Sequence, residues 1–324
     1  MRIAITGSIA TDHLMTFPGR FVEQFIPEKM DRVSLSFLVD GLEIRRGGVA
    51  ANIAFGLGVL GLKPLLIGAV GADFAPYRAW LSEHGVDCAG VRESVIAHTA
   101  RFVCTTDTDG NQIASFYPGA MTEDADIELA PIVAAAGGLD LVLIGASDPA
   151  AMLSHTQECR DLGIPFAADL SQQLPRLAEP EVRALVDGAA YLFCNEYEEA
   201  LIERKSTWSG PQILDRVGAR VTTLGPAGAR IERAGQPPVL IGPVPEVRKA
   251  DPTGTGDAFR SGFLAAVAWG LSLERAAQLG NMLAVHVLET VGTQEYELKP
   301  GVLAERVSAV YGAAAADEIS ACYC

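Results

Sequence analysis

The stretch 251–259 reads DPTGTGDAF, and a helical pattern of residues follows it. Its glycines allow the backbone to turn tightly and to bring successive N–H groups together. Because the turn ends where the helix begins, these groups lie at the positive end of the helix dipole, which favours anions. Asp257 falls in the first helical turn, where it could remove a proton from a hydroxyl that attacks phosphorus. The stretch therefore predicts a phosphate-binding turn with its own general base. A glycine-rich turn with Asp257 as helix cap is the alternative.

Apolar runs of strand length alternate with helical patterns around this stretch. The expected strands are 2–7, 64–68, 139–144, 165–169, 190–194 and 220–224, and the expected helices are 49–60, 75–84, 150–162, 179–187, 196–203, 257–270 and 273–290. Such alternation is typical of βαβ units, and near-continuous apolar strands are typical of sheets covered on both faces. We therefore predict the α/β class, with a doubly wound, mostly parallel sheet flanked by helices.

Two segments interrupt this alternation. Residues 33–39 and 42–46 have β character around an Asp-Gly pair at 40–41, and residues 101–106 and 112–117 read as a hairpin. Asp-Gly between strands is a strong hairpin signal. We predict a small projecting β-sheet that acts as a lid over the carboxyl ends of the parallel strands, with ordinary surface hairpins as the alternative. Residues 1–324 are expected to form one domain, with lid segments at about 12–46 and 99–119 inserted into it.

Composition excludes several classes of protein. The chain has 25 Lys and Arg against 40 Asp and Glu, a net charge of −15, and 49% of its residues are apolar. The apolar content excludes disorder, and the absence of any long basic run argues against nucleic acid or a membrane surface as partner. No apolar stretch reaches the roughly 18 residues that span a bilayer. The chain opens as a strand rather than a signal peptide, and its six cysteines are dispersed, so we expect a cytoplasmic protein with reduced thiols and no zinc site.

Two phosphate-binding fingerprints are excluded. Residues 56–61, GLGVLG, match G-x-G-x-x-G, but they follow a helical run and precede a strand. A dinucleotide fingerprint has the opposite context, so we interpret these glycines as sites of close helix packing. No G-x-x-x-x-G-K-[ST] string occurs in the chain, which excludes a P-loop.

Four motifs resemble, in order, those of the ribokinase-like (PfkB) family of carbohydrate and nucleoside kinases. Residues 251–259 are similar to the second family signature, with Thr255 where alanine is usual, and residues 46–54, RGGVAANIA, to the first. Residues 195–198, NEYE, resemble the family's N-x-x-E motif, and residues 222–228, TTLGPAG, resemble its ATP-contacting turn. The resemblance implies the fold predicted above and an ATP-dependent phosphotransferase.

Within the family, the resemblance is closest to adenosine kinases of actinobacterial type. It is carried by residues 34–40, 98–102, 112–121 and 168–174 and runs almost from end to end. It implies phosphorylation of the 5′-hydroxyl of adenosine to AMP, a reaction of purine salvage; a ribokinase-like sugar kinase or an inosine or guanosine kinase is the alternative. Carboxylates accept hydrogen bonds from neighbouring ribose hydroxyls, and aromatic rings stack on bases. The nucleoside site implied in this way consists of Ser8, Asp12, Ser36, Gly48, Asn52, Phe102, Phe116, Gln172 and Gln173.

The resemblance also implies the catalytic and phosphoryl-donor residues. Asp257 is the implied base, and Gly254, Thr255 and Gly256 form the anion-binding turn. Mg²⁺ keeps most of its waters in proteins, so Glu198 is expected to hold it through water, with a capping pair at a helix start as the alternative. K⁺ as an activator is a family expectation. The implied ATP contacts are Asn195, Thr223, Gly225, Gly228 and Asn281.

Two further expectations concern assembly and activity. An exposed lid edge favours pairing with a second copy, so we predict a homodimer through the lids. A nucleotide-sensing or scaffolding protein without activity is the alternative from another class. Such a protein would be expected to have lost its base or the glycines of the turn, whereas Gly254, Gly256 and Asp257 are all present.

Overall fold

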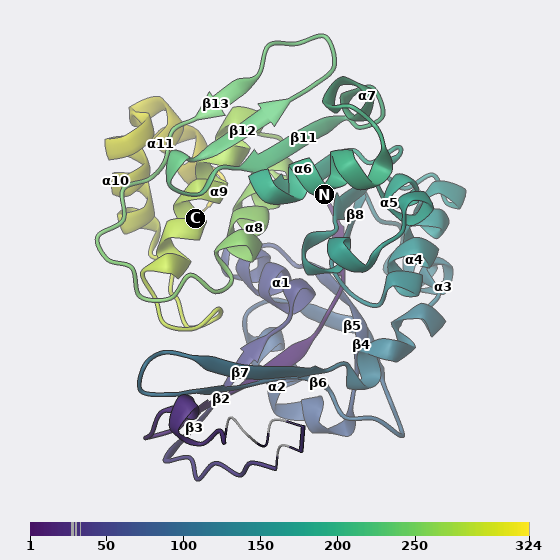
Figure 1. Cartoon of the computed structure of the whole chain (residues 1–324). Coiled ribbons are helices and arrows are strands. Elements are labelled where there is room, and N and C mark those ends of the chain that lie inside the picture. Colours follow the sequence, from purple (N-terminus) through teal and green to yellow (C-terminus); the bar gives the residue numbers. More distant parts are fainter. Residues whose placement is uncertain (27–28, 30, 33, 324) are drawn as a thin grey trace.

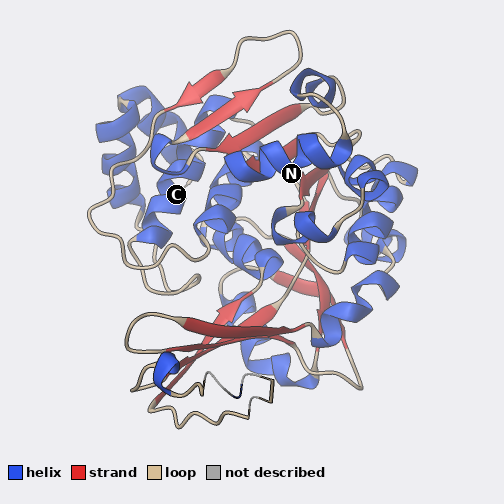
Figure 2. Ribbon diagram, viewed as in Figure 1, coloured by secondary structure: helices blue, strands red, loops and turns tan. Residues whose placement is uncertain are grey.

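The central sheet is mostly parallel (Figures 1 and 2). The computed structural model describes residues 1–26, 29, 31, 32 and 34–323, and within them nine strands form this sheet. All neighbouring pairs from β11 to β5 are parallel, and β12 and β13 add an antiparallel edge, which confirms the predicted sheet. In spatial order the strands are β13 (Val239–Ile241), β12 (Ala229–Glu232), β11 (Ala219–Thr223), β10 (Tyr191–Asn195), β9 (Phe166–Asp169), β8 (Leu141–Ile144), β1 (Ile3–Thr6), β4 (Leu65–Val70) and β5 (Asp87–Glu93).

Helices cover both faces of this sheet (Figure 2). Alternate strand residues point to opposite cores: Ile5 and Phe193 pack in one, and Ala4 and Leu192 in the other. Burial on both faces explains why the strands read as apolar runs. The first face is covered by α1 (Val49–Val59), α2 (Ala75–Glu83), α8 (Thr255–Ala268), α9 (Leu273–Leu288), α10 (Pro300–Tyr311) and α11 (Ala313–Ser320), and the second by α3 (Leu129–Ala136), α4 (Pro149–Asp161), α5 (Glu179–Val186), α6 (Glu196–Ser206) and α7 (Gly210–Leu214). Short 3₁₀ helices include η1 (Phe21–Glu23), η3 (Ala72–Phe74), η4 (Gly119–Asp126), η5 (Ser171–Arg176) and η6 (Gly225–Ala227).

A second sheet, the lid, projects from one end of this body (Figure 1). Its strands are, in order, β3 (Gly41–Gly47), β2 (Ala10–Thr16), β6 (Ala100–Thr106) and β7 (Gln112–Tyr117). The hairpin of β6 and β7 is as predicted. The hairpin predicted around residues 40–41 is wrong, because β3 pairs with β2 while residues 34–39 form no strand; Val33 lies outside the described residues. The strand β2 was not predicted, because it contains polar residues and lacks an apolar run. Its partners β3 and β6 come from distant segments of the chain.

Close helix packing explains Gly56 and Gly58, as predicted, but not Gly61, which has no neighbour within 4 Å of an added Cβ and has a φ of 83°. A Cβ on Gly58 would lie 2.0 Å from the carbonyl oxygen of His84, and one on Gly56 would lie 2.5 Å from Oγ of Ser261. Both glycines therefore let α1 approach its neighbours closely, and neither opens a helix after a strand.

Two further features of the described residues concern the lengths of the helices and the state of the cysteines. Among the described residues, no helix is both long and apolar enough to cross a bilayer. The five cysteines in the described part of the chain are free thiols, and four of them are buried; Cys324 lies outside it.

Candidate active site

The predicted phosphate-binding turn forms the N-terminus of α8. Gly254 caps the helix with a φ of 77°, a conformation that favours glycine. A Cβ there would lie 2.8 Å from Cγ2 of Thr293, so the side chain must be absent. Asp251 stabilises the start of the turn, since its Oδ1 accepts a hydrogen bond from the Thr253 N–H at 2.9 Å. The first N–H groups of α8 thus lie at an end where helices favour anions.

Asp257 lies in the first turn of α8 and is half-buried. Its Oδ2 accepts a hydrogen bond from Nδ2 of Asn52 at 2.8 Å. Burial raises the pKa of Asp257 to about 7, although the Asn52 hydrogen bond and the Arg260 guanidinium oppose the shift. A carboxyl with a pKa near neutrality suits general-base chemistry. The alternative in which Asp257 caps the helix is wrong, because Gly254 holds that position and Asp257 lies inside the helix.

A buried ion pair between Arg260 and Asp169, which sequence reasoning missed, stabilises the turn. Arg260, on α8, donates from Nη2 to Oδ1 of Asp169 at 2.8 Å, and its Nε lies 2.5 Å from Oδ2. Its Nη1 donates to the carbonyl of Gly256 at 3.0 Å. Two-pronged contacts of this kind fix geometry as well as charge. The available signals were the position of Asp169 at the carboxyl end of a strand and of Arg260 three residues after Asp257.

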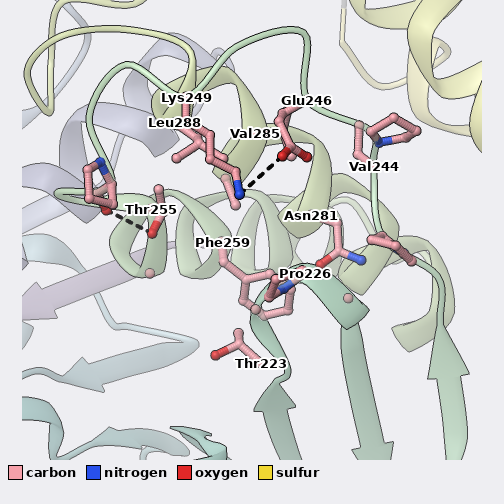
Figure 3. A pocket seen from close by; sticks show the side chains of 17 residues that line it. Thr223, Pro226, Val244, Glu246, Lys249, Thr255, Phe259, Asn281, Val285 and Leu288 are labelled. Carbon is pink, nitrogen blue, oxygen red and sulfur yellow. Dashed lines mark hydrogen bonds and ion pairs between the residues drawn. The ribbon is translucent and has the colours of Figure 1, made fainter.

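A cavity of about 450 Å³ lies next to the turn (Figure 3). Thr255 and Gly256 line one side of it, and Val285 and Leu288 give it an apolar wall. Mostly apolar walls with a few polar groups are typical of small-molecule sites. Four of the five predicted ATP-contacting residues line this cavity, namely Thr223, Gly225, Gly228 and Asn281.

The fifth, Asn195, forms a capping box with Glu198 at the start of α6. Oδ1 of Asn195 accepts from the Glu198 N–H at 2.8 Å, and Oε2 of Glu198 accepts from the Asn195 N–H at 2.9 Å. Asn195 is opposite Thr223 in the β10–β11 register, and Thr223 lines the cavity. Asn195 and Glu198 therefore lie beside the cavity. Burial raises the pKa of Glu198. The described residues contain no group of three or more His, Cys, Asp or Glu side chains suited to a metal ion. Oε1 of Glu198 is not used by the capping box, and a single carboxylate oxygen suits a Mg²⁺ that keeps most of its waters.

Three of the predicted nucleoside-site residues surround the start of α1 near Asp257. Gly48 has a φ of 96°, and a Cβ there would lie 2.5 Å from the Ser8 carbonyl oxygen. The Ser8 hydroxyl accepts a hydrogen bond from the Val49 N–H at 3.0 Å. Asn52, one turn later, contacts Asp257. The turn at 47–48 therefore brings backbone and amide groups to Asp257.

Three further residues of the predicted nucleoside site form one row across the lid. Asp12 on β2 is opposite Phe102 on β6, which is opposite Phe116 on β7, so all three share a face. Arg45 continues the row on β3, and its Nη1 lies 3.1 Å from Oδ2 of Asp251. This face of the lid is therefore directed at the phosphate-binding turn. Burial raises the pKa of Asp12 to about 6, with Arg45 opposing it.

The remaining predicted residues have no hydrogen bond to Asp257 or to this row within the described part of the chain. Ser36 is exposed in the strandless segment 34–39. Gln172 is exposed in η5, where its Oε1 accepts from the Ser171 hydroxyl. Gln173 is buried, and its Oε1 has no hydrogen-bond partner among the described residues.

Comparison with known proteins identifies the family of this chain. The sequence model of the pfkB family of carbohydrate kinases matches residues 7–299 of this chain. The chain belongs to this family. It therefore has the ribokinase-like fold that the motifs indicate and is a phosphotransferase with an alcohol group as acceptor.

Nucleoside kinases stand among the relatives of this PfkB kinase. The nucleoside kinase of Methanocaldococcus jannaschii is 26% identical over 295 residues, which cover 90% of this chain and 92% of the relative. That of Methanothermobacter thermautotrophicus is 30% identical over 270 residues, or 82% and 85% of the two chains. The solved nucleoside kinase of Burkholderia thailandensis in complex with inosine is 33% identical, with a TM-score of 0.83 over 96% of this chain and 98% of that one. These similarities support a nucleoside or sugar kinase.

Proposed function

We propose that this PfkB kinase transfers the γ-phosphoryl group of ATP to the 5′-hydroxyl of a purine nucleoside. The observation that carries the proposal is the position of Asp257. It lies at the N-terminus of α8, next to Gly256 of the cavity that Asn281 lines, and it is close enough to Asp12 of the lid for the two charges to interact. A base between a donor cavity and an aromatic-lined acceptor face is what the reaction requires.

Asp257 performs proton transfer in the proposed reaction. Its carboxylate accepts the proton of the 5′-hydroxyl as the oxygen forms a bond to the γ-phosphorus, and the bond from that phosphorus to the ADP oxygen breaks. The N–H groups at the start of α8 stabilise the charge on the transferring group. Mg²⁺, when bound near Glu198, neutralises phosphate charge. None of these groups requires a basic side chain, which reconciles a net charge of −15 with a polyanionic substrate.

The acceptor is proposed as a purine nucleoside with inosine or guanosine ahead of adenosine. The motifs resemble adenosine kinases, but the Burkholderia thailandensis nucleoside kinase was solved in complex with inosine and with ADP-inosine. This likeness supports the alternative better than adenosine. Phe102 and Phe116 are opposite each other on β6 and β7, and in this proposal their rings stack on the purine. Stacking alone does not distinguish the base edge.

A panel of acceptors tests this proposal. ADP release is measured with inosine, guanosine, adenosine, ribose and fructose at saturating ATP and Mg²⁺, with and without K⁺. We expect the highest kcat/KM with a purine nucleoside. Faster turnover of ribose or fructose than of every nucleoside would overturn the acceptor class while leaving the family intact.

The remaining predictions become proposals here. We propose one kinase domain over residues 1–324, a cytoplasmic location supported by free cysteines, and a homodimer through the lid. The lid face opposite Asp12 supports the dimer, because it exposes apolar side chains to solvent. These are Leu42, Ile44, Ile113 and Tyr117, which are 61%, 60%, 43% and 45% exposed. Light scattering at micromolar concentration tests it, and a monomer contradicts it.

A further inference from the structure

A chain of buried amides leads away from Asp257. Asn52 donates from Nδ2 to Oδ2 of Asp257, and its Oδ1 accepts from Nε2 of Gln294 at 2.9 Å. The same nitrogen of Gln294 donates to the Tyr77 hydroxyl at 2.6 Å. Asn52, Gln294 and Tyr77 are 7%, 1% and 5% exposed, so water does not compete for these contacts. The chain joins α8, α1, the loop after α9, and α2.

The hydrogen bonds of this chain share one direction, from Gln294 toward Asp257 and toward Tyr77. The Tyr77 hydroxyl donates to the carbonyl of Gly47 at 2.9 Å, so its oxygen is free to accept from Gln294. Oδ1 of Asn52 accepts from Gln294 and lies 2.9 Å from the Thr293 hydroxyl, whose single hydrogen is shared between Oδ1 and the Arg46 carbonyl at 3.0 Å. With Gln294 donating to Oδ1, the NH₂ group of Asn52 faces Asp257.

Gln294 satisfies this arrangement at the expense of its own carbonyl. Its Oε1 is buried and has no hydrogen-bond partner among the described residues. An unpaired buried carbonyl is destabilising, and such groups in folded proteins call for an explanation. Reversing the Gln294 amide would set Oε1 against Oδ1 of Asn52. Asn52 would then turn its own oxygen toward the carboxylate of Asp257.

We infer that Gln294, together with Thr293, is a positioning residue for phosphoryl transfer, because it holds the Asn52 amide with its NH₂ group on Oδ2 of Asp257. The other carboxylate oxygen then remains for the acceptor hydroxyl. The inference rests on the proposed role of Asp257 as base. Neither residue was assigned a role from the sequence, because the two meet Asn52 across more than 240 positions of chain.

Other charged groups also act on Asp257 and stay in place when Gln294 is changed. Burial raises the pKa of Asp257, Arg260 on the same helix lowers it, and Asp169 from β9 and Asp12 from β2 raise it. Tyr296, after α9, also faces Asp257, whose charge adds to the effect of burial in raising the Tyr296 pKa. A change in pH dependence on substitution of Gln294 therefore reports the Asn52 contact.

The test compares Gln294→Met, Thr293→Val and their double variant with Gln278→Met. Each substitution keeps side-chain size and removes a donor. Gln278 is a matched control, since it is 6% exposed and hydrogen-bonded to Arg275 on α9, outside this chain of contacts. The readouts are the thermal midpoint and kcat/KM for the nucleoside between pH 5 and 9.

We expect the acidic limb of the kcat/KM profile to move to higher pH by about one unit in Gln294→Met, and further in the double variant. In Gln294→Met this shift corresponds to about a tenfold loss of kcat/KM at pH values well below the limb and to little loss above it. The nucleoside KM should change little. An unshifted limb in both single variants, with a lowered thermal midpoint like that of Gln278→Met, would show a merely structural role. Asp257→Asn separates the two proposals: if it keeps activity, the proposed base fails; if it is inactive and the limbs stay unshifted, only the positioning role fails.

Discussion

The phosphate-binding turn and the lid carry the two halves of the candidate site, and they are stabilised in different ways. The turn is held by buried contacts, among them Asn52 to Asp257 and Arg260 to Asp169. The lid projects from the body, and its face toward the turn ends at Phe116, which is 49% exposed. Part-exposed ion pairs such as Arg45 to Asp251 and Arg101 to Asp73 connect it to the body.

We expect this difference in stabilisation to assign phosphoryl transfer to the turn and selection of the acceptor to the lid. Groups that act on the transferring phosphoryl need fixed geometry, because electrostatic stabilisation depends on preorganised donors. Groups that select the acceptor must admit it and release it, and segments with few buried contacts are suited to such movement. Changes in the turn should therefore alter turnover or stability, whereas changes in the lid should alter acceptor binding.

The largest effect is expected at the base. Asp257→Asn removes the proton acceptor while keeping the size of the side chain, so kcat should fall roughly 10²–10⁴-fold. Single-turnover phosphoryl transfer and ATP binding by calorimetry are the measurements, and ATP affinity should persist. A loss of less than tenfold in kcat would contradict the division between the two halves.

The next effect concerns the buried ion pair. Arg260→Met leaves the Asp169 carboxylate buried without its partner, so the free energy of unfolding should fall by about 3–5 kcal/mol. Urea denaturation measures it. Arg275→Met is the control, since Arg275 pairs with the half-exposed Glu318, and exposed pairs contribute about 1 kcal/mol or less. Equal losses in the two variants would show that the turn gains little from Asp169.

A smaller effect is expected on the lid. Phe116→Ala removes a ring from the face that carries Asp12, and stacking of a base contributes about 1–3 kcal/mol, so the nucleoside KM should rise roughly tenfold. The KM for ATP should stay unchanged. Ser115→Ala is the control: Ser115 is exposed on the preceding position of the same strand and points to the opposite face. Equal nucleoside KM values in the two variants would remove the aromatic face from the proposed site.

The last expected effect is on the pH dependence of stability. Burial raises the pKa of Asp124, beneath the ends of β4 and β8, to about 7, against an ordinary value of 3.8. Between these values the folded state binds more protons than the unfolded state, so this carboxyl lowers stability as the pH rises from about 4 to about 7. Asp124→Asn should flatten that slope in urea titrations, whereas the exposed neighbour variant Asp126→Asn should leave it unchanged. A slope identical to wild type in Asp124→Asn would contradict the raised pKa.

Pattern reasoning was most successful where contacts are local. Six strands and seven helices of the body, and the turn at 251–257, were predicted within a few residues, because apolar periodicity and glycine spacing are properties of short segments. The strands β5, β12 and β13 and the helices α3, α7, α10 and α11 were not predicted. Pattern reasoning also missed β2 and gave β3 the wrong partner, since the observed pairing joins residues 10–16 to residues 41–47. Strand pairs between distant segments leave no signal in a short window of sequence.

Short segments of the sequence are enough to predict the fold class, the family, the phosphate-binding turn and Asp257 as the proposed base, because their signals are local. The groups that act on Asp257 follow from the tertiary structure alone. Asn52 reaches Asp257 across 205 positions, and Asp169 reaches Arg260 across 91. Within the part of the chain that the structure describes, Gln294 makes its hydrogen bond to Asn52 and none to the carboxylate of Asp257. Such contacts arise when helices pack on a sheet, because burial and hydrogen-bond satisfaction are settled in three dimensions and not by spacing along the chain.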